Sequence, residues 1–501
     1  MHRLTLARIY ICICFAAMLL PAAAYSQSKA PQTNAGTALH LLPVKNMRND
    51  LTLLWQAIQH MHPAYGLYYP ADSLQLLYRQ TLAAMDTPAT ESAFMSHIYP
   101  LLSKLACGHT QLKHSAGYTR VPSPHLPFEV LAQHHRAWVT THQVNTIATG
   151  DEIHSINGID VKHIIAHGYN LYAGDGYNET FKELFLSEYD GFEDACNDLH
   201  LQPPYRLVLT TKDGVHKQVT VSMPAGNATM PATAAQSNAV SNWITDTTIA
   251  DGRLQFLKHQ PVAWFRAGAY QYSDTLLFKE VFQHVHDAHT RTLILDLRHN
   301  TGGDIRVAAK LLSYLADAPY HMISRMESRI PNPAINGFEQ YFDTDRTAGF
   351  NEGFYAGKQA GNWYQVNFKP AFGDVAATLP LSTVDHFDGR LLVLIDGATF
   401  SAGAHTAAAI RAQCRNARFI GRETAGNEEG CSGGTIQHFT LPNTGIVVEF
   451  PWMRVVSVAQ HPVPGRGVMP DDTVEYTAAD IVQQNDLDIQ RALLLVEKYM
   501  P

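Results

Sequence analysis

Two apolar runs in the C-terminal half of the chain constrain its fold most strongly, because each one breaks abruptly into small residues. The first reads LILDLRHNTGGD (residues 293–304), and the second reads LLVLIDGATFSAGAH (residues 391–405). Such a run indicates a buried parallel strand, and the small residues indicate a loop at its carboxyl end. Strands that alternate with helical segments predict an α/β domain with right-handed connections. Open α/β sheets bind ligands at the carboxyl ends of their strands, so these loops are the candidate site.

Each of the two loops carries groups that can act on a substrate. The first contains a glycine pair, Gly302 and Gly303, whose backbone N–H groups a substrate can approach closely. The second contains Ser401, which follows the strand and opens an expected helix over residues 402–411. A serine at a strand-to-helix turn with donors nearby is a candidate nucleophile, but many serines are solvated or cap a helix. The local pattern leaves both roles open for Ser401.

Four blocks, in this order and spacing, resemble the tail-specific (C-terminal processing) proteases of family S41. They are the two runs above, FIGRETAGN (residues 419–427) and GRGVMPDD (residues 465–472). The resemblance covers most of residues 45–498 and implies an α/β catalytic core of the ClpP and crotonase type. It places Ser401 at the nucleophile position of a serine peptidase. The oxyanion hole, by the same resemblance, comprises the backbone N–H groups of Gly302, Gly303 and Ala402.

The general base departs from the commonest form of this family. Many tail-specific proteases use a lysine where this chain has Asn427, and no lysine lies within residues 370–497. A serine hydroxyl needs a base. The element Gly108-His109-Thr110 resembles the tricorn-like branch, in which a histidine from the N-terminal region serves as the base. The resemblance implies that His109 accepts the Ser401 proton and returns it to the leaving amine; the alternative is a structural histidine at a helix end.

The acid that orients the imidazole is less well defined. We expect Glu423 in this role, with Glu428 and Glu429 as the next choices. The tricorn-like branch usually carries its acid nearer the Pro-Asp end, where this chain has Pro464-Gly465. The glutamate that usually follows the nucleophile loop is also absent. The sequence therefore leaves the acid open.

A second serine motif, around Ser432, suggests a different class of protease. The stretch GCSGG (residues 430–434) resembles the serine loop of chymotrypsin-like proteases. Those enzymes need an all-β double barrel and an upstream histidine element that this chain lacks, so we expect Ser432 in a glycine-rich loop near the site. The chain also has no G-x-S-x-G around Ser401, which argues against an α/β-hydrolase.

The N-terminus predicts export. Residues 1–26 read as a secretory signal, with an apolar stretch over residues 9–20 and cleavage after Ser26, or after Ala24 as the next choice. That stretch is shorter than the ~20 residues of a spanning helix, so we expect no stable membrane span after signal removal. The expected location is periplasmic or extracellular. Four cysteines remain, which permits two disulfides of undefined connectivity: Cys107, Cys196, Cys414 and Cys431.

The rest of the chain is predicted to form three domains and a linker. Residues 27–118 carry apolar residues at helical spacing and predict an N-terminal helical domain with the histidine motif. Residues 119–223, with short strands and an Asn157-Gly158 turn, resemble a PDZ-like domain that captures extended peptides; the alternative is a β-rich insert without a peptide ligand. Residues 224–254 are rich in small and polar residues and predict a linker. Residues 255–501 form the expected catalytic domain.

Composition narrows the function further. The formal net charge of −8 and the absence of a basic run argue against nucleic-acid binding, and the 26 histidines show no H-E-x-x-H spacing. We therefore expect an exported serine endopeptidase that cleaves protein or peptide substrates through an acyl-enzyme, without metal or cofactor. Two alternatives stay open. One is a binding protein that keeps the fold with weak or no activity, and the other is an esterase or amidase that acts on small molecules.

Overall fold

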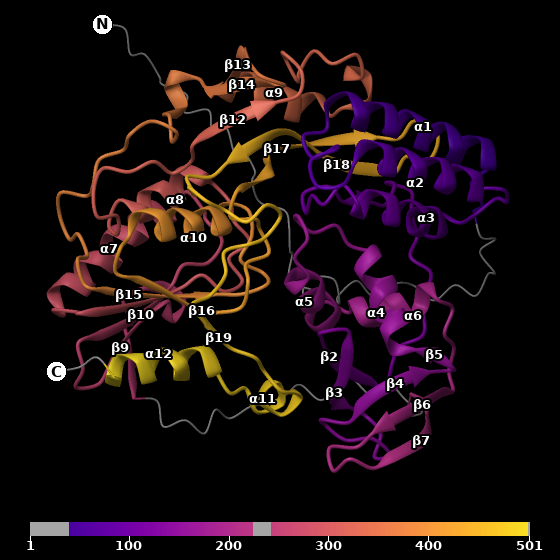
Figure 1. The fold of residues 1–501 in the computed structure, drawn as a ribbon, viewed down its shortest axis with the longest axis horizontal. Helices are drawn as coiled ribbons and strands as arrows, with labels where there is room; N and C mark the ends of the chain where they lie inside the picture. The colour runs from indigo at the N-terminus through magenta and orange to yellow at the C-terminus, as the bar shows by residue number, and fades with distance from the viewer. Residues whose placement is uncertain (1–39, 224–241, 499–501) are drawn as a thin grey trace, which may run out of the picture.

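The structure, a computed structural model, describes residues 40–223 and 242–498. In these two stretches the chain forms three sheets with helices packed against them (Figure 1). No helix in the same stretches combines the length and the apolar character needed to cross a bilayer. The predicted signal, residues 1–26, lies outside the described residues.

A seven-stranded sheet forms the centre of the C-terminal half. Two of its central strands are β11 (Thr292–Asp296) and β15 (Arg390–Ile395), which run parallel with Leu293 opposite Leu391. The prediction of buried parallel strands is therefore confirmed for both apolar runs. The other strands, in chain order, are β8 (Trp243–Thr245), β9 (Leu254–Leu257), β10 (Val262–Arg266), β16 (Ala417–Gly421) and β19 (Asp472–Thr473).

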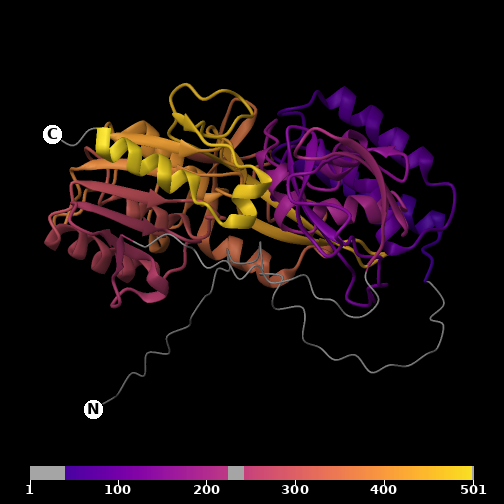
Figure 2. The same cartoon turned by 90° about the horizontal axis from the view of Figure 1, so that it is seen from below.

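Helices cover both faces of this sheet, which explains why β11 and β15 are buried along nearly their whole length. Leu293 and Leu295 belong to the core on one face, whereas Ile294 packs on the other face with α12 (Leu487–Lys498), seen in front of the sheet in Figure 2. The helix that follows Ser401 matches the one predicted over residues 402–411. The helices on the first face are α7 (Asp274–Asp287), α8 (Ile305–Leu312) and α10 (Ala402–Gln413).

A second sheet joins the N-terminal helices to the C-terminal half. Its pairs are antiparallel, and β1 pairs with β18 so that Leu112 lies opposite Val448. Its strands are β1 (Leu112–Lys113), β12 (Arg325–Ser328), β13 (Phe354–Ala360), β14 (Trp363–Phe368), β17 (Gly430–Thr440) and β18 (Val447–Val456). The helices beside its strand β18 in Figure 1 are α1 (Val44–Met61), α2 (Ala71–Ala84) and α3 (Glu91–Ser103). Buried side chains of these helices, such as Trp55, share one hydrophobic core with this sheet and the seven-stranded sheet. The β1–β18 pairing therefore fixes the loop before β1 against the C-terminal half.

The third sheet has a hydrophobic core of its own. Asn157 and Gly158 both have positive φ, 50° and 87°, and they form the predicted hairpin turn between β4 and β5. Its strands are β2 (Phe128–Gln133), β3 (Arg136–His142), β4 (Glu152–Ile156), β5 (Ile159–Asp160), β6 (Tyr205–Thr210) and β7 (His216–Val221). The helices between β5 and β6 are α4 (Val161–Asn170), α5 (Thr180–Glu188) and α6 (Gly191–Asp198). The PDZ-like identity of this region stays a prediction.

The predicted linker, residues 224–254, ends earlier than the sequence indicated. Residues 224–241 lie outside the described part, but β8 begins at Trp243 and pairs antiparallel with β9. Trp243 packs against the apolar core beneath the seven-stranded sheet, so this side chain stabilises an edge strand where composition alone indicated a spacer. The remaining short elements are α9 (Thr344–Gly353), α11 (Ala478–Gln483) and 3-10 turns at Ala250–Gly252, Glu339–Tyr341 and Pro370–Phe372.

Candidate active site

Ser401 lies at the turn between β15 and α10, where the backbone is strained. Its φ of 51° is in the left-handed region, which costs a non-glycine residue on the order of 1–3 kcal/mol. The turn is held from both sides, because Phe400 N–H donates to the Asn300 carbonyl over 2.9 Å and His405 N–H donates to the Ser401 carbonyl over 2.9 Å. This geometry aims a serine hydroxyl away from its strand, at the carboxyl edge of the sheet.

His109 reaches Ser401 from the opposite half of the chain. Its Nε2 lies 3.1 Å from Ser401 Oγ, although 292 residues separate the two. The turn that presents it follows α3, and the Thr110 N–H donates to the Cys107 carbonyl within it over 3.0 Å. The imidazole also packs against the Phe400 ring, with 4.6 Å between the ring centroids. The Gly-His-Thr element and the serine loop therefore form one site.

The imidazole of His109 is uncharged in the resting site. Burial lowers its pKa to about 4, and the Glu449 charge and the Ser432 carbonyl oppose this shift only in part. His109 is therefore neutral at neutral pH. Glu449 itself is engaged elsewhere, because it forms an ion pair with Lys113 and its Oε1 lies 3.7 Å from His438 Nε2. A neutral imidazole beside a serine hydroxyl is the resting arrangement that general-base catalysis requires.

The glycine loop after β11 packs directly on Ser401. Gly302 and Gly303 have φ of 100° and 124°, and a Cβ on Gly302 would lie 2.7 Å from Ser401 Cβ. One correction applies to the predicted oxyanion hole. The Gly302 N–H donates to Asn300 Oδ1 over 2.9 Å and is not free for an oxyanion. Of the three predicted donors, Gly303 and Ala402 remain, and Ala402 is the first residue of α10, where the helix dipole adds positive potential.

An ion pair ties the glycine loop to the serine loop. His299 Nδ1 lies 2.7 Å from Asp396 Oδ2, and Asp396 Oδ1 accepts from the backbone N–H groups of His299 and Ala398 over 3.1 and 2.9 Å. The hydrogen bond to Asp396, with a second one to Glu188, raises the pKa of His299 to about 10. Burial alone would raise the pKa of Asp396, but the hydrogen bond and charge of His299 lower it to about 2. Both groups are charged at neutral pH and hold the two loops together.

Glu423 is not positioned to orient His109. Its carboxylate accepts from the Arg466 guanidinium over 2.8 and 2.5 Å and from the Gly467 N–H over 2.7 Å. Glu429 is likewise engaged, with Arg454 over 3.5 Å and with the Gly465 N–H over 3.2 Å.

The third predicted acid, Glu428, does not supply the missing contact. Within the described residues, His109 Nδ1 is buried and has no hydrogen-bond partner. The imidazole therefore has no hydrogen bond to any of the three predicted acids, Glu423, Glu428 and Glu429. These residues lie near the family motif in the sequence, but the fold does not bring their carboxylates to His109 Nδ1.

The carboxylate beside His109 belongs to Asp175, in the loop between α4 and α5. Asp175 Oδ1 accepts from the Gly108 N–H over 2.7 Å, and Oδ2 is buried without a partner. One of its oxygens, a ring nitrogen of His109 and the sulfur of Cys107 all lie within 4.8 Å of one another. Burial raises the pKa of Asp175 to about 7. In the sequence its signal is slight, an aspartate between two glycines 66 residues beyond His109.

The four cysteines that the sequence offered for disulfides are all buried and free. Two of them border the site. Cys107 Sγ–H donates to the Ser432 carbonyl over 3.6 Å, and Cys431 Sγ lies 3.7 Å from His405 Nε2. Ser432 itself lies within strand β17, not in the loop that the sequence indicated.

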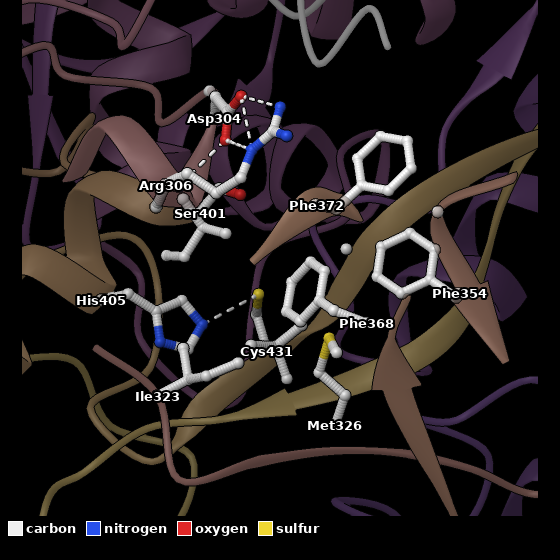
Figure 3. Close-up of a pocket in the computed structure, with 16 residues that line it drawn as sticks. Asp304, Arg306, Ile323, Met326, Phe354, Phe368, Phe372, Ser401, His405 and Cys431 are labelled. Atoms are coloured by element: carbon white, nitrogen blue, oxygen red, sulfur yellow. Dashed lines mark hydrogen bonds and ion pairs between the residues drawn. The ribbon is translucent and has the colours of Figure 1, made fainter. Parts of the chain in front are cut away.

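A mostly apolar pocket opens beside Ser401, as Figure 3 shows. It encloses about 640 Å³, including the solvent at its mouth. Asp304 and Arg306, paired with each other over 2.9 Å, supply charge on one side. The apolar lining residues labelled in the figure are Ile323, Met326, Phe354, Phe368 and Phe372.

Comparisons with known proteins give a matching family and similar folds. Residues 265–474 match the model of Peptidase family S41. No curated protein matches the chain. Among solved structures, mature CPAF is similar over 90% of this chain and 96% of that chain, at 17% identity and a TM-score of 0.58. A structure of mature CPAF complexed with lactacystin is similar at the same identity and TM-score, over 90% of this chain and 98% of that one. At this identity the likeness concerns the fold.

Proposed function

Because this chain is a serine-type peptidase of family S41, we propose that Ser401 is its nucleophile and His109 its general base, and that it hydrolyses peptide bonds in polypeptides. The observation that carries this proposal is the 3.1 Å between His109 Nε2 and Ser401 Oγ. The Lys-dyad alternative has no support, because Asn427 stands in the lysine's place.

The reaction follows from the groups around Ser401. His109 Nε2 takes the hydroxyl proton while Oγ attacks the substrate carbonyl carbon, and the same nitrogen then protonates the leaving amine. Water hydrolyses the acyl-enzyme with His109 again as the base. The N–H groups of Gly303 and Ala402 stabilise the oxyanion, and donors of this kind are each worth about 3 kcal/mol.

Asp175 is our choice for the acid, in place of Glu423. The imidazole becomes positively charged during each step, and it lies buried, where an unbalanced charge is costly. The Asp175 carboxylate is the buried acidic group within 4.8 Å of the His109 ring and Cys107 sulfur. We infer that it stabilises the imidazolium and acts as a positioning residue through His109.

The pocket beside Ser401 favours a substrate with a large apolar side chain next to the scissile bond. Phe354, Phe368 and Phe372 present rings to this pocket (Figure 3). Burying a leucine or phenylalanine side chain contributes about 1.5–3 kcal/mol to binding. A polypeptide supplies such side chains, and the PDZ-like region, if it takes an extended segment by strand addition, would help to present them. We also propose that the signal at residues 1–26 directs the protein to the periplasm or the extracellular space.

Cleavage of an unfolded protein tests the proposal. Purified wild type should degrade unfolded casein, and Ser401→Ala should not. Ser432→Ala should still degrade it, because this variant keeps the backbone carbonyl that accepts from Cys107. Equal cleavage by wild type and Ser401→Ala would contradict the proposal. Hydrolysis of small esters without proteolysis would favour the esterase, and a folded protein inert in both assays would favour the binding protein.

A further inference from the structure

The sulfur, nitrogen and oxygen donors behind the Ser401–His109 pair form a compact cluster. Cys107 Sγ, a His109 ring nitrogen and an Asp175 carboxylate oxygen lie within 4.8 Å of one another, and the three residues are only 1%, 5% and 2% exposed. Zinc bonds of about 2.0–2.3 Å in a tetrahedral arrangement place donor atoms about 3.5 Å apart. The three side chains therefore need only small rotations to bind one ion.

Two polar atoms of these residues are buried and make no hydrogen bond, which points to a ligand independently of the cluster. They are His109 Nδ1 and Asp175 Oδ2. A buried polar atom without a partner costs about 1–3 kcal/mol, so native structures rarely leave such atoms unpaired. The other atoms of both side chains already have partners: His109 Nε2 has Ser401 Oγ, and Asp175 Oδ1 has the Gly108 N–H. These contacts leave the unpaired atoms for a cation.

The donor types select the ion. Calcium and magnesium prefer sets made of oxygen atoms, whereas a thiolate, an imidazole and a carboxylate together suit zinc. The thiolate of Cys107 and the carboxylate of Asp175 carry two negative charges, which balance a divalent ion in a buried place. The sequence did not indicate this site, because the third ligand comes from a loop 66 residues beyond His109, whereas the other two, Cys107 and His109, are separated by Gly108 alone.

We propose that zinc binds Cys107, His109 Nδ1 and Asp175 and reversibly inhibits the peptidase. This inference depends on the proposed role of His109 as the general base. A neutral imidazole that gives the Nδ1 lone pair to a metal carries its proton on Nε2. Nε2 then donates to Ser401 Oγ and cannot accept the hydroxyl proton. The Cys107 thiol releases its proton to solvent as the Zn–S bond forms, and zinc removal restores the active tautomer.

Cobalt binding tests the site without relying on activity. The full-length mature protein, titrated with Co²⁺, should show a thiolate-to-cobalt charge-transfer band at one ion per chain, and added Zn²⁺ should abolish it. Cys107→Ser should lose this band, and Asp175→Asn should weaken Co²⁺ affinity by at least about tenfold. Cys414→Ser, which removes another buried free cysteine away from the site, should behave as wild type. Absence of the band in folded wild type, or its persistence in Cys107→Ser, would overturn the proposal.

Inhibition is measured separately, as the rate at which a fluorophosphonate labels Ser401. Zinc should slow labelling of wild type and Cys414→Ser, and a chelator should restore it, whereas Cys107→Ser should keep its own metal-free rate at the same zinc concentration. Cys107→Ala repeats this test if the serine variant does not fold. A cobalt band with no labelling in metal-free protein would contradict the proposed function alone. Normal labelling that zinc does not affect would contradict the metal site alone.

Discussion

The substitution Gly302→Ala should disable Ser401 although it replaces neither residue of the proposed catalytic pair. A Cβ at residue 302 would lie 2.7 Å from Ser401 Cβ and 2.8 Å from Ala402 N, whereas ordinary contact begins at 3.4 Å. Both neighbours belong to the serine turn, so that turn must move by about 0.6 Å or more. A misplacement of about 1 Å can cost a catalytic site about 10²-fold, which is about 2.7 kcal/mol. We therefore expect the rate constant for fluorophosphonate labelling to fall about a hundredfold.

A matched control separates this clash from backbone strain. Gly302 has φ of 100°, where an alanine costs about 1–2 kcal/mol whatever its surroundings. Gly214 has φ of 83° and nothing within 4 Å of an added Cβ, so Gly214→Ala carries the strain without the clash. Chemical unfolding should show lower stability for both variants, and labelling kinetics should be slow only for Gly302→Ala. Labelling of folded Gly302→Ala within threefold of wild type would refute the role assigned to this loop.

Three further predictions concern the surroundings of the site. The His299–Asp396 pair stabilises the fold fully between the unfolded pKa values of 3.8 and 6.5, and this contribution is lost as pH rises towards 10 or falls towards 2. His299→Ala should therefore lower the free energy of unfolding more at about pH 5 than at about pH 10, and an equal loss at both would contradict this linkage. Glu423→Gln should lower thermal stability but keep labelling within about threefold, whereas Asp175→Asn should slow labelling at least about tenfold; the reverse order would restore Glu423 as the acid. Phe368→Ala should lower kcat/KM for peptides with a large apolar residue at the scissile bond about tenfold and leave alanine peptides nearly unchanged. An equal loss for both peptides would place the side-chain site elsewhere.

The sequence predicted the elements whose residue pattern is local, such as the buried strands β11 and β15. β11 and β15 are buried on both faces, so each reads as a continuous apolar run, and each run ends at its loop. The predicted end of the linker, at residue 254, was wrong because β8 begins before that point and pairs with β9. Strand pairing depends on two segments together, so the composition of one segment does not reveal it. The same holds for Ser432, whose glycine neighbours indicated a loop but whose backbone pairs with Arg454 in β18.

The sequence predicted residues of the candidate site only where they belong to a family motif. Ser401 and His109 were identified by family resemblance, since no local pattern relates two residues 292 positions apart. The prediction that Glu423 orients His109 was wrong, because the Glu423 carboxylate accepts a hydrogen bond from Arg466 instead. Asp175, the acid that we propose, was missed because no sequence motif marks its loop, which the hydrogen bond from the Gly108 N–H holds at the histidine turn. The donors of the oxyanion hole could be refined only from the hydrogen bond between Gly302 and Asn300.

Mass spectrometry after treatment with a fluorophosphonate tests the pairing of Ser401 with His109 most directly. The mature protein, Ser401→Ala and His109→Ala would be treated side by side, with folding of each checked by circular dichroism. The predicted result is one adduct on Ser401 of the wild type that is absent from both variants. An adduct on another residue, labelling of His109→Ala at the wild-type rate, or an unlabelled folded wild type would contradict it.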